Sequence, residues 1–433
     1  MQKRSRDRST VTNATARGHL LVDVEKLALL AQLTHRSSMT FSVVGSRNGP
    51  QGACSSSEKK TLKDHVSLRH HSYTLKRDRH LHESLCLVMK YESAKSPVKE
   101  WQKEMKGVPM LHTHICDLLD IKHPIMSAPM SGGIAAAELT AAVSQAGGFG
   151  LIGAMTSDGP DWLRAQIREV RERTDKPFGV GFISSFPGLD ELVQVALEEH
   201  VTAVSHSFAD PTPYISSAHA VGVKVIAQVQ TVAQAIRGVQ AGVDVLVAQG
   251  TEAGGHTGYI STLPLVATVV DVARTLPVLA AGGIADGRGL AAMLLLGAQG
   301  VWMGTRFYAS REAGARAWEK QRMVKAGADE TVLIKVYDFT FAYPFPSTIG
   351  DRVLGNDYTA RWHGHDEDVV AHREELREQV SAAMKEGDVH LAAVRAGNAV
   401  GLIHNIESAC TIVRQTAAEA ESILRERPGQ LLR

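Results

Sequence analysis

Short apolar runs alternate with longer amphipathic segments along most of the chain, from about Ile115 onward. Eight of these runs predict strands, and each of the first seven precedes a segment whose apolar residues recur at helical spacing. The runs are continuous in Val, Ile, Ala and Leu, which is typical of strands buried on both faces of a parallel sheet. The predicted strands cover residues 123–130, 149–155, 177–184, 202–208, 224–229, 243–250, 277–283 and 299–307.

This alternation of strand and helix over about 200 residues predicts an α/β fold, a (β/α)8 TIM barrel. A doubly wound open sheet is the structural alternative, and in both folds the carboxyl ends of the strands carry the site. Asp158 and Asp190 stand where helix N-caps are expected. Glycines stand at predicted helix ends, at Gly147, Gly222, Gly242 and Gly297.

We expect three parts in the chain: a basic, disordered extension over residues 1–109, the barrel over 110–312, and a helical segment over 313–433 that packs on the barrel. In the last part, residues 367–390 predict an amphipathic helix broken near Gly387, and residues 399–426 predict another. We expect both helices to close over the barrel mouth. A simple packing appendage is the alternative.

Charge is distributed unevenly. Residues 1–100 carry 18 Lys and Arg against 9 Asp and Glu, and the remaining residues carry 29 against 37. The mildly acidic body is therefore not expected to bind nucleic acid. An organellar targeting peptide, or an arm that binds nucleic acid or membrane, is the alternative to a disordered extension. No apolar run reaches the roughly 18 residues of a membrane span.

The cysteines have neither CxxC nor zinc-site spacing; they are Cys54, Cys86, Cys116 and Cys410. We therefore expect no metal site, a reduced compartment and a cytoplasmic location. We expect a monomer or a homodimer.

Several familiar catalytic motifs are absent from the sequence in a supporting context: GxSxG, HExxH, the P-loop and GxGxxG. Strand ends carry almost no carboxylates, so glycosidase chemistry is not supported. His206, at the end of the fourth predicted strand, is compatible with either a catalytic or a structural role. His363 and His365 are expected at the surface.

The densest group of candidate residues follows the sixth predicted strand, in AQGTEAGGHTGY, residues 248–259. Gly254 and Gly255 allow a flat ligand to approach the backbone closely. A histidine side chain, which His256 places among these glycines, has the acid–base chemistry that a general base needs. We therefore interpret His256 as the candidate catalytic base.

Glycines also end the seventh and eighth predicted strands, in LAAGGIADGRGL and VWMGTRF. These strands are neighbours in a barrel, so their backbone N–H groups are expected to converge on one phosphate. Two ordinary tight turns, which also need glycine, are the alternative. The residues of this candidate phosphate site are Gly282, Gly283, Ile284, Gly304 and Thr305.

Two further groups suit a planar ring. Met130, Ser131 and Gly132 follow the first predicted strand and offer a smooth backbone wall, although an ordinary turn is the alternative. Gln228 and Gln249 end the fifth and sixth strands, and their amides match the N–H/C=O edge of a flavin. Buried structural glutamines are equally compatible with the sequence.

Together these motifs resemble the nitronate monooxygenase family, formerly called 2-nitropropane dioxygenases, over about residues 115–375. LVAQGTEAGGHTGY carries the most specific motif, and PIMSAPMSGG, AVSQAGGFGLIGA, AQVQTVAQA, PVLAAGGIADGRGL and VWMGTRF accompany it. Residues 334–364 also resemble the C-terminal segment of fungal and bacterial members. The resemblance implies an FMN-containing TIM barrel with a smaller helical lid. It implies oxidation of alkyl nitronates, and of nitroalkanes, by O2 to a carbonyl compound and nitrite.

The resemblance also implies roles for individual residues. His256 matches the catalytic base of the family, and Gly254 and Gly255 match the loop that packs on the flavin. The wall beside the flavin matches Met130, Ser131 and Gly132, the residues near the ring match Gln228 and Gln249, and the phosphate cradle matches Gly282, Gly283, Gly304 and Thr305.

The chain departs from the family pattern at two places. Many members carry Asn at the end of the third strand, where this chain has Gly181, and FAYPFP stands where relatives often have a Trp-Pro pair. We therefore expect the substrate range to differ. The competing functions are an FMN-dependent enoyl-ACP reductase that uses NAD(P)H and an inactive FMN-binding protein.

Overall fold

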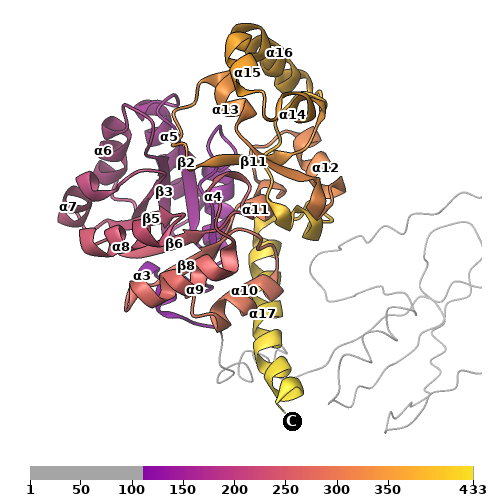
Figure 1. The fold of residues 1–433 in the computed structure, drawn as a ribbon. Helices are drawn as coiled ribbons and strands as arrows, with labels where there is room; N and C mark the ends of the chain where they lie inside the picture. Colours follow the sequence, from indigo (N-terminus) through magenta and orange to yellow (C-terminus); the bar gives the residue numbers. More distant parts are fainter. Residues whose placement is uncertain (1–110, 433) are drawn as a thin grey trace, which may run out of the picture. The chain divides into compact units, whose positions relative to one another are not determined.

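Eight parallel strands form one sheet whose two ends meet (Figure 1). The order around the sheet is β1-β9-β8-β6-β5-β4-β3-β2, and a bridge between Met126 and Phe149 joins β1 to β2. The computed structural model describes residues 111–432, and this closed parallel sheet confirms the predicted TIM barrel. The strands are β1 Ile125–Ser127, β2 Gly150–Ala154, β3 Phe178–Ile183, β4 Ala203–Ser207, β5 Lys224–Val229, β6 Val245–Gln249, β8 Val278–Ala281 and β9 Gly300–Met303.

Helices connect the strands and cover the outside of the barrel. The glycines expected at helix ends all have positive φ values there, which terminates each helix without steric strain. The connecting helices are α4 Ala137–Gln145, α5 Pro160–Arg173, α6 Asp190–Glu198, α7 Thr212–Ala220, α8 Val232–Ala241, α9 Thr262–Ala273 and α10 Gly287–Leu295.

The two predicted aspartate N-caps are wrong. Gly159 is the N-cap of α5, and Asp158 instead accepts a hydrogen bond from the Met155 backbone at 2.8 Å. Asp190 is the first residue of α6 and accepts a hydrogen bond from the Tyr214 hydroxyl at 2.8 Å. A carboxylate before a helix has several donors within reach, so sequence position alone does not decide which one it takes.

Two apolar layers form the core of the barrel. One fills its interior and includes Leu279 and Trp302 together with Ile115 and Leu119 of helix α3 (His114–Leu119). The other lies between the strands and the surrounding helices. The Thr113 hydroxyl, next to α3, donates to the Gln299 carbonyl, which directly precedes β9. Helix α3 therefore closes the amino-terminal end of the barrel, and the carboxyl end is left for a site.

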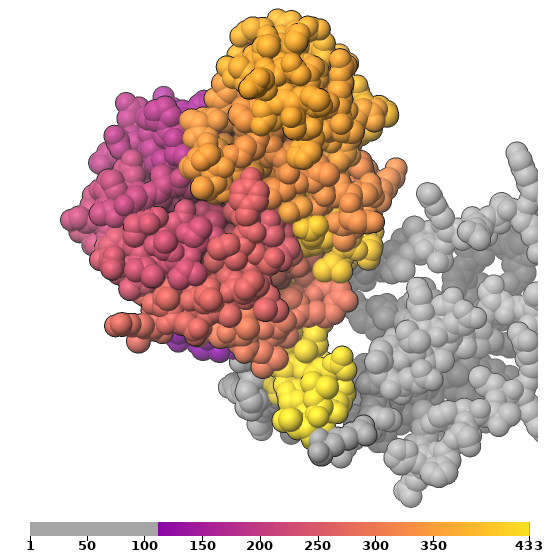
Figure 2. Space-filling model, in the orientation of Figure 1, coloured from indigo at the N-terminus to yellow at the C-terminus, as the bar shows by residue number. Residues whose placement is uncertain are grey.

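The segment after the barrel strands contains strands as well as the expected helices. Strands β10 (Thr331–Ile334) and β11 (Gly350–Leu354) form an antiparallel sheet with β7 (Gly255–Thr257), which belongs to the glycine-rich loop after β6. This sheet joins the segment to the barrel loop that carries His256. The segment's helices are α12 Ala317–Lys325, α13 Val336–Phe341, α14 Asp357–Trp362, α15 Asp366–Ala371 and α16 Arg373–Glu386, and Figure 2 shows part of it as an orange lobe on the barrel.

The last helix, α17 (Ala409–Leu431), does not close over the barrel mouth, in contrast to the expectation from sequence. It packs along α10 and also contacts α4, on the outside of the barrel (Figure 1). Helix α17 therefore completes the ring of helices around the barrel. In the chain, the segment with β10, β11 and helices α12 to α16 separates it from the last barrel strand, β9.

Some sequence predictions concern residues outside the described range. These are the disordered or targeting extension over residues 1–109 and the two cysteines within it, Cys54 and Cys86. The domain division at residue 312 stays a prediction, and the described residues, 111–432, belong to one compact unit. Among residues 111–432, no helix combines the length and apolar character needed to cross a membrane.

Candidate active site

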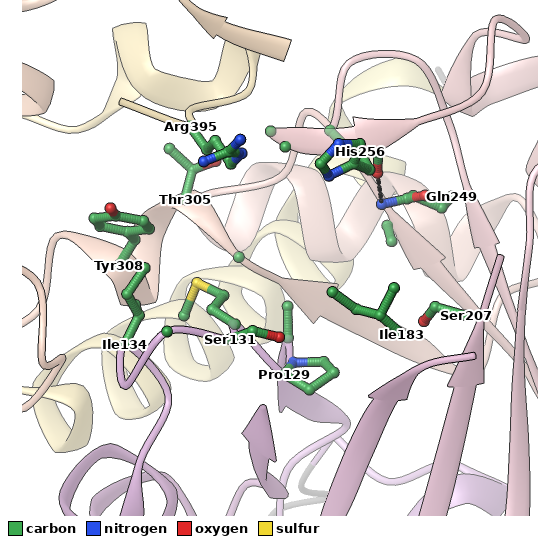
Figure 3. Close-up of a pocket in the computed structure, with 18 of the residues that line it drawn as sticks. Pro129, Ser131, Ile134, Ile183, Ser207, Gln249, His256, Thr305, Tyr308 and Arg395 are labelled. Atoms are coloured by element: carbon green, nitrogen blue, oxygen red, sulfur yellow. Dashed lines mark hydrogen bonds between the residues drawn. The ribbon is translucent and has the colours of Figure 1, made fainter. Parts of the chain in front are cut away.

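One cavity of about 420 Å³ opens at the carboxyl ends of the barrel strands (Figure 3). Its lining includes residues that directly follow β1, β4, β8 and β9 and the last residue of β6, as expected for this fold. Every residue predicted for the site lines this cavity, although their roles stay predictions. They are Met130, Ser131, Gly132, Gln228, Gln249, Gly254, Gly255, His256, Gly282, Gly283, Ile284, Gly304 and Thr305.

The wall after β1 lies directly against neighbouring strands. A Cβ atom at Gly153 would lie 2.4 Å from the Met130 carbonyl carbon, so this backbone approach requires glycine in β2. A Cβ atom at Gly181 would lie 2.3 Å from Cγ of Pro129. Pro129 therefore fills the space that a side chain at position 181 would need. This contact gives a physical reason for glycine where many relatives are expected to carry Asn.

The candidate phosphate site consists of backbone groups after β8 and β9. Gly282 and Gly283 have φ values of +102° and +74°, which side chains rarely adopt. Within the described part of the chain, no acceptor is present for the backbone N–H groups of Gly283, Ile284, Gly304 and Thr305. These N–H groups border the cavity and are available to an anion.

The two predicted glutamines differ in their surroundings. Gln249 donates to the His256 carbonyl at 3.1 Å and accepts from the Gln230 amide at 3.0 Å (Figure 3). Gln249 therefore fixes the backbone of His256, which lines the same cavity. Gln228 accepts a hydrogen bond from the Ser207 hydroxyl, and its amide nitrogen has no partner among residues 111–432.

His256 lies on β7, and its side chain is 10% exposed. Its Nε2 atom lies 2.7 Å from Oδ1 of Asp338, and its ring stacks on Phe345 with ring centroids 3.4 Å apart. Nδ1 forms no hydrogen bond with residues 111–432, and it is not fully buried. The Asp338 carboxylate accepts a hydrogen bond from Nε2–H, so the lone pair of neutral imidazole resides on Nδ1.

Sequence reasoning missed three charged residues around His256: Asp338 on α13, Asp351 on β11, and Arg395. Asp351 is fully buried and faces Arg395, with Nη2 to Oδ2 at 2.8 Å and Nε to Oδ1 at 3.1 Å. Burial disfavours the charged form of Arg395, but the Asp351 carboxylate outweighs it and raises the guanidinium pKa above its usual range. The only available signal was the resemblance of residues 334–364, which covers the two aspartates without singling them out.

The two acidic groups beside His256 already have partners within the protein. Ligand atoms of His256, Asp338 and Asp351 all lie within 4.8 Å of one another, a spacing that also suits a metal ion. Asp351 is already neutralised by the Arg395 guanidinium and Asp338 is hydrogen-bonded to His256. A cation would therefore compete with a guanidinium for the same carboxylate.

The other histidines considered from sequence lie away from the cavity lining. His206 is 1% exposed, stacks on Tyr214 with centroids 4.9 Å apart, and accepts or donates a hydrogen bond at 2.9 Å with Ser184. Burial lowers the His206 pKa to about 4, so this histidine is neutral and structural. His363 and His365 are exposed, as predicted.

The family model described as nitronate monooxygenase matches residues 112–192 and 183–419. A relative from Mycobacterium tuberculosis, named (3aS,4S,5R,7aS)-5-hydroxy-7a-methyl-1-oxo-octahydro-1H-indene-4-carboxyl-CoA dehydrogenase, is 38% identical over 225 residues. The matched part spans 52% of this chain and 63% of that relative.

Two solved structures are similar over about three quarters of the chain. FabK from Thermotoga maritima has a TM-score of 0.67 and 37% identity, with 74% of this chain and 100% of that chain covered. A nitroalkane oxidase from Streptomyces ansochromogenes has a TM-score of 0.64 and 27% identity, with 73% and 99% covered. The match of the family model along most of the barrel and the following segment shows that this chain belongs to the nitronate monooxygenase family.

Proposed function

We propose that this protein is an FMN-dependent oxidoreductase that uses O2 to oxidise alkyl nitronates, and the parent nitroalkanes, to a carbonyl compound and nitrite. The family membership and the likeness to a nitroalkane oxidase support this proposal. The observation that carries it is the position of His256 in the cavity, with Nε2 engaged by Asp338 and Nδ1 without a protein partner among residues 111–432.

The residues around the cavity fit FMN. Unpaired N–H groups of Gly283, Ile284, Gly304 and Thr305 suit the phosphate, because oriented backbone amides bind anions. The backbone of Met130, Ser131 and Gly132 offers a flat wall to a ring, and Gln228 and Gln249 offer amides to its polar edge. Bound FMN supplies the electron acceptor that passes electrons from the substrate to O2.

The protein's own chemistry centres on proton removal and orientation. A neutral nitroalkane must lose its α-carbon proton, and Nδ1 of His256 accepts it while Asp338 fixes the tautomer and stabilises the resulting cation. A nitronate is already deprotonated, so the imidazole then orients the substrate. Aromatic side chains from the barrel loops and from the following segment enclose the substrate side of the cavity, and they are Phe186, Phe208, Tyr343 and Phe345.

Absorption spectroscopy of the purified protein, followed by O2 uptake with ethyl nitronate and nitroethane, tests the proposal. We expect a flavin spectrum and turnover of both substrates. The variant His256→Asn should keep bound FMN and lose about 10²- to 10⁴-fold in kcat with nitroethane, the usual contribution of a positioned base. Normal turnover of nitroethane by this variant would contradict the assignment of the base.

A flavin-dependent enoyl-ACP reductase that uses NAD(P)H is the second candidate, and the 37% identity to FabK favours it. Rapid mixing with NADPH separates the two functions, because fast bleaching of the flavin absorbance indicates a reductase. A yellow protein that reacts with neither NADPH nor nitronates would support an inactive FMN-binding protein. A cytoplasmic location and a monomeric or homodimeric state stay predictions.

A further inference from the structure

Arg395 lies in a segment that is fixed on both sides by backbone hydrogen bonds. Leu354 of β11 donates to the Val394 carbonyl at 2.8 Å. Gly397 donates to the Thr305 hydroxyl at 3.0 Å, and Asn398 donates to the Glu252 carbonyl at 3.0 Å. The position of Arg395 is therefore set by the barrel loops on one side and by the added sheet on the other.

The guanidinium of Arg395 is only partly used by the protein. Asp351 accepts from Nε and faces Nη2, whereas Nη1 has no acceptor within the described chain. The side chain lines the cavity and is 29% exposed (Figure 3). Arg395 thus retains two N–H donors beside a space that a ligand can enter.

Arg395 and His256 are close neighbours through Asp351 and Gly255. Asp351 pairs with His256 in the register of β11 and β7, and ligand atoms of these two residues lie within 4.8 Å. The Cδ atom of Arg395 lies 3.7 Å from the position of a Cβ on Gly255, the residue before His256. A cationic donor and the candidate base therefore line the same cavity and are linked through Asp351.

The pairing of Arg395 with Asp351 determines which ligands the guanidinium recognises. Asp351 and Arg395 are neutral as a pair, so an incoming anion meets directed N–H donors rather than a net positive field. Guanidinium binds planar groups with two oxygens especially well. A nitronate group is planar, has two oxygens and is anionic, whereas the nitro group of a nitroalkane is neutral.

We propose that Arg395 is a specificity-determining residue whose Nη1 group binds the oxygens of the substrate's nitronate group. Arg395 thereby favours the anionic nitronate over the neutral nitroalkane. This inference rests on the proposed function. The phosphate of the flavin is the alternative anion for Arg395 to bind. The experiment must separate these two sources.

Propionate is a suitable probe, because its carboxylate is also planar, anionic and two-oxygen, and it does not react. Ligand-observed NMR titration measures its affinity for the purified protein without turnover. Arg395→Gln alone leaves Asp351 buried without a partner, so the main variant is the double variant Asp351→Asn/Arg395→Gln. Asp351→Asn alone is the matched control, and Arg316→Gln removes an exposed charge from the rim of the same cavity.

We expect the double variant to weaken propionate binding about 10- to 100-fold, the usual effect of losing a hydrogen bond to a charged group. Arg316→Gln should stay within about threefold of the wild type, because it removes only an exposed charge. Asp351→Asn should bind propionate at least as tightly as the wild type, because Arg395 then lacks its internal counter-charge. The KM for ethyl nitronate should rise in the double variant relative to Asp351→Asn, while the KM for nitroethane should not.

Three results would overturn the inference: wild-type protein that does not bind propionate, equal affinities in the double variant and in Asp351→Asn, or loss of FMN from the double variant alone. The last result would assign Arg395 to the flavin. If the proposed function is wrong, wild-type protein shows no O2 uptake with ethyl nitronate. The propionate titration does not depend on turnover, so it still tests the role of Arg395.

Discussion

His256 and Asp338 are 82 residues apart in the chain and are joined by one 2.7 Å hydrogen bond. Both side chains are at least nine-tenths buried, so the pair is shielded from competing water. A carboxylate on one ring nitrogen fixes the tautomer and leaves the other nitrogen as the acceptor. At the scale of single residues, the candidate base therefore belongs to a two-residue unit, in which we propose that Asp338 is the positioning residue.

Replacing Asp338 by Asn tests this unit. The amide retains the size of the side chain but removes the charge that stabilises protonated His256, so kcat with nitroethane should fall by about 10²-fold or more. The rate with ethyl nitronate, which is already deprotonated, should fall much less. The measurement is O2 uptake with nitroethane and with ethyl nitronate.

Asp366→Asn, on the exposed helix α15, is the control and should leave the rate unchanged. A purely structural Asp338 would lower the rates with nitroethane and with ethyl nitronate equally, and that outcome would contradict the positioning role.

At the scale of elements, α17 and α10 form a close interhelical contact. A Cβ on Gly287 would lie 2.5 Å from the Ala420 backbone nitrogen, and the Gly287 N–H donates to Glu419 at 2.8 Å. Glycine therefore lets the start of α10 approach the backbone of α17. Because α17 completes the helix ring, this contact joins the C-terminal end of the chain to the barrel.

The variant Gly287→Ala should destabilise the protein by about 1–3 kcal/mol, the range observed when extra atoms are forced into a packed interface. Urea unfolding followed by circular dichroism measures the change as a lower midpoint. Gly429→Ala lies in the same helix α17 with nothing near its added Cβ, so it should be neutral or slightly stabilising. Equal midpoints for the two variants would show that close packing of α10 against α17 does not contribute to the free energy of unfolding.

At the scale of the whole molecule, buried histidine couples stability to pH. His206 has a folded-state pKa of about 4 because burial disfavours its charged form, against 6.5 for an exposed histidine. Between these two pH values, His206 is protonated in the unfolded chain and neutral in the folded protein. The free energy of unfolding therefore decreases as the pH falls from about 6.5 to about 4.

The contribution of His206 is on the order of 3 kcal/mol across this window. Urea unfolding at pH 7.0 and pH 4.5 measures the loss in the wild type, and His206→Gln should show a smaller loss. The comparison isolates His206, since all other titrating groups are the same in both proteins. An identical pH dependence of the two proteins would contradict the burial argument.

The sequence by itself determined the barrel, its order of strands and helices, and the cavity end. Apolar runs, helical spacing and glycines at turns are local patterns, and each reports burial or backbone conformation within a few residues of itself. For the same reason, Gly282, Gly283 and the loop of His256 were predictable as parts of one site, because the carboxyl ends of parallel barrel strands always meet at one face.

Only the tertiary structure decided which charges surround His256 and where the last helix packs. Asp338, Asp351 and Arg395 come from segments far along the chain, and an isolated aspartate or arginine in the sequence has no pattern that distinguishes it from a solvated one. Their meeting depends on the pairing of β7 with β11. That pairing is a long-range contact, which the packing of the whole chain selects and no local periodicity encodes.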